Sequence, residues 1–177
     1  MSNPSAPLPS SAFQAALETF ERSIKINVPE WLKMTLALWS GYSTLSNSDE
    51  LSLMFAADNE FDMAMLTWCY EGENREKPNS THTLDKDTPF PSIRFQRVLS
   101  ADQKTLNDDE MPKGLPPLLY MGASLNYAYM ALHDSGLLEA MFNRANPFDA
   151  AMLLWCVAAR HRTSKCNSLV QANLSRN

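Results

Sequence analysis

Glycine is scarce in this chain, with five among 177 residues, and no glycine-rich phosphate-binding motif occurs. The patterns GxGxxG, GxSxG, HExxH and the Walker loop are all missing, so nothing indicates dinucleotide binding, a serine-hydrolase nucleophile or a zinc peptidase. The three histidines, His82, His133 and His161, do not stand at a spacing that pairs them with a nucleophile or a carboxylate. We therefore expect no catalytic residue, no cofactor and no enzymatic activity.

Long apolar runs are also missing, and cysteine is sparse. No apolar run approaches the roughly 18 residues that a membrane-spanning helix needs. The first residues lack the basic and apolar regions of a secretion signal. Three cysteines without CxxC spacing fit a reducing compartment, and Cys156, His161 and Cys166 match no strong zinc pattern. The sequence predicts a soluble, cytoplasmic protein without a bound metal or a membrane partner.

The formal net charge of -5 is small and has the wrong sign for nucleic acid, which we do not expect as a partner. No basic stripe with interleaved aromatic residues occurs. The charge is uneven, because no acidic residue follows Arg160 in the sequence. We expect residues 163–177 to form a basic tail, which either is solvated or contacts an acidic partner or phosphate.

Apolar residues recur at helical spacing along most of the chain. Ser11 and Gln14 form a possible capping box before a first helix, whose apolar positions are Phe13, Ala16, Leu17, Phe20 and Ile24. Gly41 and Gly72 are stop signals for a second helix from Pro29 and for another from Asn59. A similar order of elements is expected over 116–133, 137–142 and 147–162.

Residues 29–69 recur without a gap as residues 116–156, at a constant offset of 87. Identical residues occupy 18 of the 41 matched positions, including Trp68 and Cys69 against Trp155 and Cys156. Such agreement predicts gene duplication. Because matched apolar stripes bury each other best about a two-fold axis, we expect an all-α closed bundle of two pseudo-two-fold related repeats.

The predicted organisation has one domain made of both repeats. A flexible arm spans 1–10, the first repeat 11–72, a polar linker 73–99, the second repeat 100–162 and the basic tail 163–177. A single short strand is possible near 93–99, because Ile93 and Phe95 alternate with polar neighbours. A brief helix is expected to begin at Ser100.

The pattern Asn-x-Phe-Asp occurs once in each repeat. Asn59 and Asn146 are expected to cap a helix, which places Asp62 and Asp149 at the third helical position beside free N–H groups. This structural role accounts for both aspartates. The alternative is that the two carboxylates meet across the axis as a metal or acid-base pair in a metal-dependent enzyme.

Large apolar residues that repeat on the last helix of each unit are predicted to form the shared core rather than a cofactor site. They are Phe61, Met65, Trp68, Phe148, Met152 and Trp155.

The function that remains is protein recognition. Ten methionines and four tryptophans supply soft apolar surface that suits partner binding, although they fit a core equally well. Residues expected at the start of the exposed linker are possible partner contacts, namely Glu71, Glu73, Arg75, Glu76 and Lys77. Our first hypothesis is a non-enzymatic protein-binding module, such as a bacterial or phage immunity protein or secretion adaptor. The alternative is an oligomerising structural or assembly protein, such as an assembly chaperone or coat-like subunit.

Overall fold

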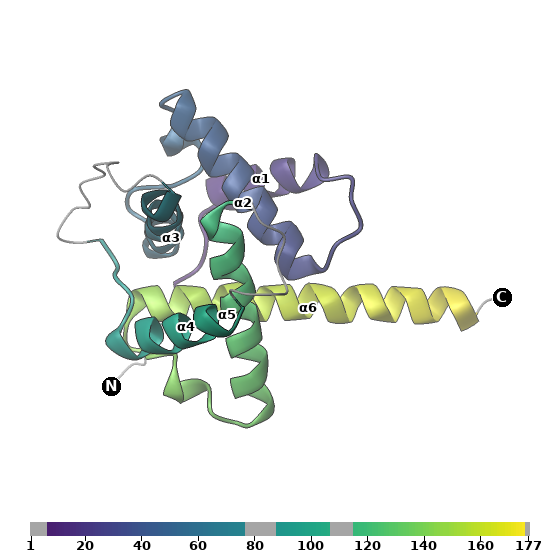
Figure 1. Ribbon diagram of the computed structural model, residues 1–177. Helices are drawn as coiled ribbons and strands as arrows, with labels where there is room; N and C mark the ends of the chain where they lie inside the picture. The colour runs from purple at the N-terminus through teal and green to yellow at the C-terminus, as the bar shows by residue number, and fades with distance from the viewer. Residues whose placement is uncertain (1–6, 77–87, 107–114, 176–177) are drawn as a thin grey trace, which may run out of the picture.

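The computed structural model describes residues 7–76, 88–106 and 115–175, and this part of the chain is helical without a strand (Figure 1). The predicted all-α class is therefore confirmed over these residues, which form a compact body. In chain order the elements are α1 (Ser11–Arg22), α2 (Glu30–Asn47), η1 (Leu51–Leu53), α3 (Glu60–Glu76), α4 (Ile93–Leu106), α5 (Pro117–Asp134), η2 (Leu138–Ala140) and α6 (Pro147–Ser175).

Helices α1 and α4 begin in the same way. Ser10 precedes α1, and its hydroxyl accepts a hydrogen bond from the Phe13 N–H at 3.1 Å. Ser92 precedes α4 and accepts from the Phe95 N–H at 3.2 Å. The predicted cap at Ser11 is therefore wrong by one residue.

The strand considered near 93–99 is wrong, and so is a helix start at Ser100, because α4 spans both. Ile93 is exposed, whereas Phe95 and Leu99 are buried four residues apart on one helical face. The alternation over 93–95 was too short to distinguish the two periods.

Helices α2 and α5 each contain 18 residues, and the bounds of α5 are those of α2 plus 87. Gly41 lies inside α2 and does not end it. A Cβ atom at Gly41 would lie 2.8 Å from Met54 Sδ, so this glycine allows close packing rather than a helix stop. Gly72 lies inside α3, where its Cβ would meet Leu118 Cβ at 3.1 Å.

A residue with a left-handed backbone conformation follows each of the helices α2 and α5. Asp49 has φ 62° after α2, and Gly136 has φ 73° after α5. The next N–H in each case bonds back into the helix, from Glu50 to Leu45 O at 2.7 Å and from Leu137 to Leu132 O at 2.8 Å. Both turns lead into a short 3-10 helix, and the second of these lies within the element expected over 137–142.

Helix α5 lies among the other helices and packs against α2, α3 and α4 (Figure 1). Its middle has the longest unbroken run of buried residues in the described part of the chain, from Met121 to Leu125. Gly122 brings α5 against α2, because a Cβ there would lie 2.9 Å from both Cγ2 and Oγ1 of Thr35. The fold therefore depends on a close helix crossing at these two residues.

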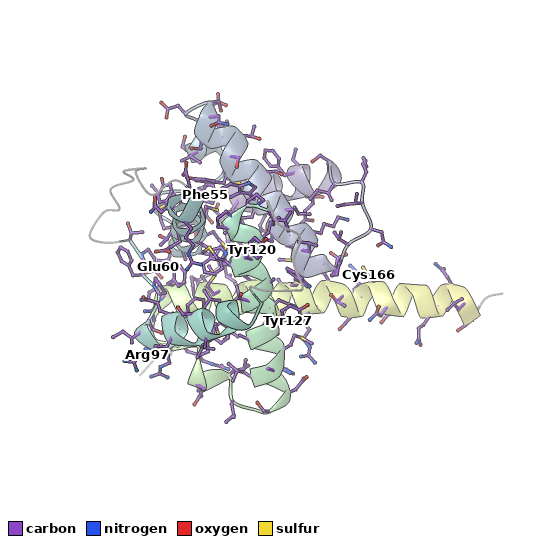
Figure 2. All side chains as sticks on the ribbon, in the orientation of Figure 1. Phe55, Glu60, Arg97, Tyr120, Tyr127 and Cys166 are labelled. Carbon is purple, nitrogen blue, oxygen red and sulfur yellow. The ribbon has the colours of Figure 1, made fainter. Side chains whose placement is uncertain are left out.

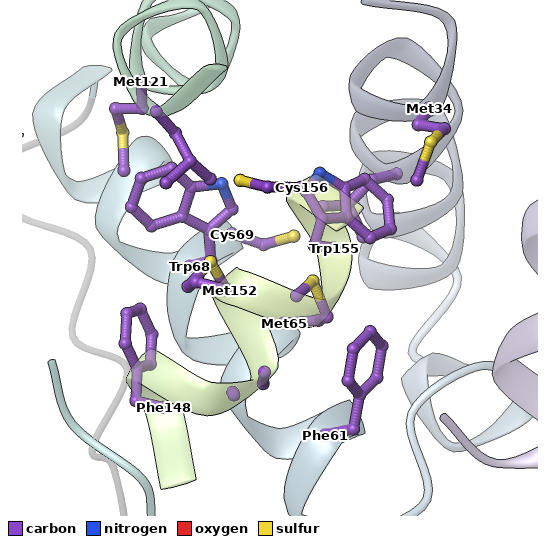
Figure 3. Packing of buried hydrophobic residues seen from close by; sticks show 14 of the residues in the cluster. Met34, Phe61, Met65, Trp68, Cys69, Met121, Phe148, Met152, Trp155 and Cys156 are labelled. Carbon is purple, nitrogen blue, oxygen red and sulfur yellow. The ribbon is translucent and has the colours of Figure 1, made fainter. Parts of the chain in front are cut away.

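The six repeated core residues are all buried, with at most 6% of any one exposed. Figure 3 shows them between α3 and α6, where matched side chains face the same interior. The rings of Phe13 and Trp155 lie 6.4 Å apart, and those of Phe95 and Trp68 lie 6.2 Å apart, both edge-on. Each half thus contributes an aromatic residue to the core of the other.

Helix α6 is 29 residues long, which is 12 more than α3. Its C-terminal part extends beyond the other helices (Figure 1), and Cys166 lies where this extension begins, 3.6 Å from a Glu30 carboxylate oxygen (Figure 2). The boundary expected near Arg162 is therefore wrong, because the basic tail continues the helix to Ser175. The predicted linker 73–99 is also shorter, since α3 continues to Glu76 and α4 begins at Ile93; residues 77–87 lie outside the described part.

None of the described helices combines the length and the apolar character needed to cross a membrane.

The close crossing of α2 and α5 gives a prediction about stability. We expect Gly122→Ala to destabilise the fold by about 1–3 kcal/mol through overpacking against Thr35, partly offset by about 1 kcal/mol of helix propensity. In a Thr35→Ala background the obstruction is removed, so the same substitution should be neutral or stabilising. Urea unfolding of the four proteins in this double-mutant cycle measures the coupling, and additive effects would contradict the described crossing.

Candidate functional site

The two aspartates of the repeated Asn-x-Phe-Asp pattern are completely buried. Asp62 accepts hydrogen bonds from the Ser10 N–H at 3.1 Å, from the Ser10 hydroxyl and from the Ala56 N–H at 2.9 Å. Asn59 Oδ1 accepts from the Asp62 N–H at 3.0 Å at the start of α3. The carboxylate therefore joins α1 to α3 and to the turn before α3.

Asp149 has the same set of donors in the second half. It accepts from the Ser92 N–H at 3.0 Å, from the Ser92 hydroxyl and from the Asn143 N–H at 2.9 Å. Asn146 Oδ1 accepts from the Asp149 N–H at 3.1 Å. The aspartates therefore accept hydrogen bonds from the segments before α1 and α4 and from the turns before α3 and α6, rather than from the free N–H groups of their own helices.

Sequence reasoning missed the serine partners, although a local signal was present. Residues 9–17 and 91–99 share Pro, Ser, Phe, Gln and Leu at an offset of 82 rather than 87. The ungapped comparison could not find them, because the second half has five more residues between this block and the next helix. In each block the glutamine side chain donates to the carbonyl of the proline, from Gln14 to Pro9 at 3.1 Å and from Gln96 to Pro91 at 3.0 Å.

The geometry gives the paired aspartates a structural role. Each carboxylate is enclosed by donors of its own half, which leaves neither directed at the other. Among the residues that the structure describes, no group of three or more His, Cys, Asp or Glu side chains could hold a metal ion. These carboxylates accept hydrogen bonds from the N–H and hydroxyl groups of Ser10 and Ser92 and from the N–H groups of Ala56 and Asn143.

We expect Asp149→Ala to destabilise the protein by about 3 kcal/mol, because three buried donors lose their acceptor. Asp149→Asn should also destabilise, since the amide presents N–H groups to other donors. Asp58→Ala, at an exposed position, is the control and should stay within about 0.5 kcal/mol in urea unfolding. A melting temperature that rises with Mg²⁺ and loses this rise in Asp149→Ala would instead support the metal alternative.

Cys69 and Cys156 are buried, and Figure 3 shows them among the core tryptophans between α3 and α6. Burial raises the pKa of both thiols above the ordinary value of 9.0, and Glu73 raises that of Cys69 further. Cys166, in contrast, is exposed on α6. The repeated cysteines are therefore protonated core residues rather than nucleophiles.

These raised pKa values predict a loss of stability at alkaline pH. The folded thiols keep their protons while unfolded thiols ionise near pH 9.0, so stability holds below that pH and falls as the pH rises above it. Each group contributes up to about 1.4 kcal/mol per pH unit. We expect urea midpoints between about pH 7 and about pH 10.5 to decline less steeply for Cys69→Ala/Cys156→Ala than for the wild type. Cys166→Ser should match the wild type, and equal slopes in all three proteins would contradict this account.

The residues expected as partner contacts lie mostly in the last turns of α3. Glu71 and Arg75 are exposed and form an ion pair at 3.9 Å. Glu73 is half-buried, and its carboxylate accepts a hydrogen bond from the Tyr42 hydroxyl. It therefore does not lie on an open linker. Glu76 ends α3, and Lys77 lies outside the described residues.

A pocket of about 860 Å³ opens between α5, η2 and α6. Its apolar wall includes Leu138, Leu153, Leu154 and Val157, and 44% of Val157 is exposed. Volumes of this size are typical of ligand sites. The side chains with hydrogen-bonding or charged groups around the wall are Tyr129, His133, Arg144, Arg160, His161 and Ser164.

Arg160 connects the polar groups of this pocket. Its guanidinium lies 2.7 Å from His133 Nδ1, and because arginine has no acceptor, that nitrogen must accept the hydrogen bond. Burial raises the pKa of Tyr129, and Arg160, which is hydrogen-bonded to Tyr129, opposes that rise. Among the described residues that line the pocket, none is acidic, although Asp134 lies 3.5 Å from His133 just outside it. The pocket therefore combines an apolar wall with positive charge.

Sequence reasoning did not find this pocket. Its leucines match the pattern of core residues, and Arg160 had been noted only as the start of the stretch without acidic residues. The signal present in the sequence was the difference between matched residues of the two halves, with Val157 in place of Tyr70 and Arg160 in place of Glu73. No family model, curated protein or solved structure matches the chain.

Proposed function

We propose that the chain is a cytosolic, non-enzymatic protein-binding module whose binding site is the pocket between α5 and α6. The observation that carries this proposal is an open apolar wall lined by Leu153, Leu154 and Val157 and bordered by arginine and histidine. Apolar surface of this kind is normally buried in a monomer, and where it stays open it commonly marks an interaction site. The charged groups at its border would orient the partner.

We also propose that the molecule consists of two copies of one helical unit related by an approximate two-fold axis between α2 and α5. Thr35 and Gly122, which touch, are matched residues at the offset of 87, as expected beside such an axis. The pairs Phe13–Trp155 and Phe95–Trp68 exchange their roles between the halves, as in a self-complementary interface. The matched aspartate and serine contacts support the same relation.

The matched turns after α2 and α5 extend this support to the backbone. Asp49 and Gly136, which both have positive φ, are also 87 residues apart. Aspartate tolerates this conformation better than most residues, and glycine adopts it without strain. We infer that the duplicated unit includes α1 and α4, with five residues inserted before α5.

A second candidate is an oligomerising structural or assembly protein. The observation that favours it is the C-terminal part of α6, which extends beyond the body and carries Leu174 with 71% of its surface exposed (Figure 1). A projecting helix of this kind is suited to packing against a second copy. It predicts a mass that grows with protein concentration.

The proposed function is tested by isolating the tagged chain from its own cells and measuring the stoichiometry and affinity of its complex. We expect Val157→Glu to weaken the complex at least tenfold, about 1.4 kcal/mol, because it places a carboxylate on the apolar wall. Leu53→Glu is the matched control, since Leu53 is 61% exposed in the first half. Both variants should keep the wild-type melting temperature.

Three other outcomes are informative. Equal binding by Val157→Glu and Leu53→Glu would place the interface outside the pocket. The absence of a stoichiometric complex would contradict the proposal. Light scattering that shows a concentration-dependent mass for the purified wild type, lost when residues 167–177 are removed, would favour the oligomer instead.

A further inference from the structure

The two halves differ in charge at one pair of matched positions next to a shared tyrosine. In the first half the Tyr42 hydroxyl donates to the Glu73 carboxylate. In the second half Tyr129 occupies the matched position, and Arg160 takes the place of glutamate 87 residues later in the sequence. The carboxylate beside the tyrosine in the first half is therefore replaced by a guanidinium in the second half.

The side chains around the two tyrosines differ in size as well. Tyr42 is flanked by the rings of Trp39 at 5.7 Å and Tyr70 at 5.8 Å. The residues that match Trp39 and Tyr70 in the second half are Asn126 and Val157. Replacing Tyr70 with valine removes a ring from the position that now forms part of the pocket wall. A similar reduction in size separates Met63 from Ala150, which also lines the pocket.

The same few positions therefore account for both properties of the pocket. Loss of large side chains provides the space, and the change from glutamate to arginine provides the charge. Arg144, His133 and His161 add further donors around it. Side chains that only packed in the core would need neither a guanidinium nor an exposed valine. These changes therefore point to a ligand with an anionic group and an apolar body.

We propose that the pocket binds an acidic segment of a partner protein, with a carboxylate held by Arg160 and Arg144 and with neighbouring large apolar side chains placed against Leu153, Leu154 and Val157. This inference rests on the proposed function and specifies the chemistry of the partner. Charge complementarity favours an acidic occupant, because the described pocket lining carries only neutral and basic side chains. Arginine binds carboxylates in a two-pronged geometry that lysine cannot reproduce.

The test uses a displayed library of random dodecapeptides, selected on the full chain. We expect wild-type protein to enrich peptides that combine Asp or Glu with Leu, Ile, Phe or Trp, by roughly twofold over the starting library. The variant Arg144→Glu/Arg160→Glu should lose this preference or reverse it toward Lys and Arg. Because Arg160→Glu recreates the tyrosine–glutamate pair of the first half, we expect this variant to fold.

Two further proteins complete the design. Arg160→Gln removes one charge without reversing it, and should bind a selected acidic peptide about tenfold more weakly in a fluorescence polarisation assay. Arg22→Glu/Lys25→Glu is the matched control with two charge reversals on exposed residues at the end of α1 and just beyond it, and should behave as the wild type. Melting temperatures of all variants establish that they are folded.

The outcomes separate this inference from the proposed function. Apolar peptides enriched without acidic residues, equally by all the arginine variants, would overturn the charge assignment while leaving protein binding intact. No enrichment at all, with a melting temperature raised by dodecanoate in the wild type but not in Arg160→Gln, would assign the pocket to a lipid-like carboxylate and overturn the inference. Selected peptides that match acidic segments of this chain would identify a second copy as the occupant and also overturn it.

Discussion

The close crossing of α2 and α5 is the constraint on which the rest of the fold depends. Thr35 and Gly122 allow these two helices to touch, because a Cβ atom at 122 would lie 2.9 Å from the Thr35 side chain. With the two helices fixed, α3 and α6 lie on either side of one interior and bury their tryptophans, cysteines and methionines there (Figure 3). The outer helices α1 and α4 are then attached through hydrogen bonds to Asp62 and Asp149. A core of this kind is sensitive to single methyl groups, because protein interiors are packed about as densely as crystals of small molecules.

Much of the helical content was predictable from the sequence, since apolar spacing is a local property. The helix ends were not. Gly41 and Gly72 resemble stop signals, but both lie inside helices. A Cβ atom would meet the side chains of Met54 and Phe20 at Gly41 and Leu118 at Gly72, which only the tertiary structure determines. The segment from Ile93 resembled a strand because Ile93 and Phe95 alternate with polar neighbours. The cap that starts its helix, Ser92, is held by a carboxylate 57 residues away, which a local pattern does not record. The C-terminal part of α6 was missed because its composition is polar and basic, although helices of polar composition are stable when they continue a packed one.

The candidate site was harder to predict than the fold. A pocket arises where side chains are smaller than the space that the backbone leaves, and no local pattern records that difference. Val157 and Ala150 fit a helical stripe as well as larger residues would, so the sequence alone marks them as core. The buried aspartates were found because their pattern repeats, but their serine partners were not, because the two blocks are offset by 82 rather than 87 residues. Arg160 stands out only at the positions where the two halves differ, because it takes the place of Glu73.

The contacts between the chain ends affect the order of folding. Glu21, at the end of α1, pairs with Arg162, 141 residues further along, and Phe13 completes a cluster with Trp155. Such distant contacts make loop closure a large part of the folding barrier. During synthesis α1, α2 and α3 emerge before α6, which packs against α2 and α3, so their apolar faces remain open to chaperones or to premature association until α6 leaves the ribosome.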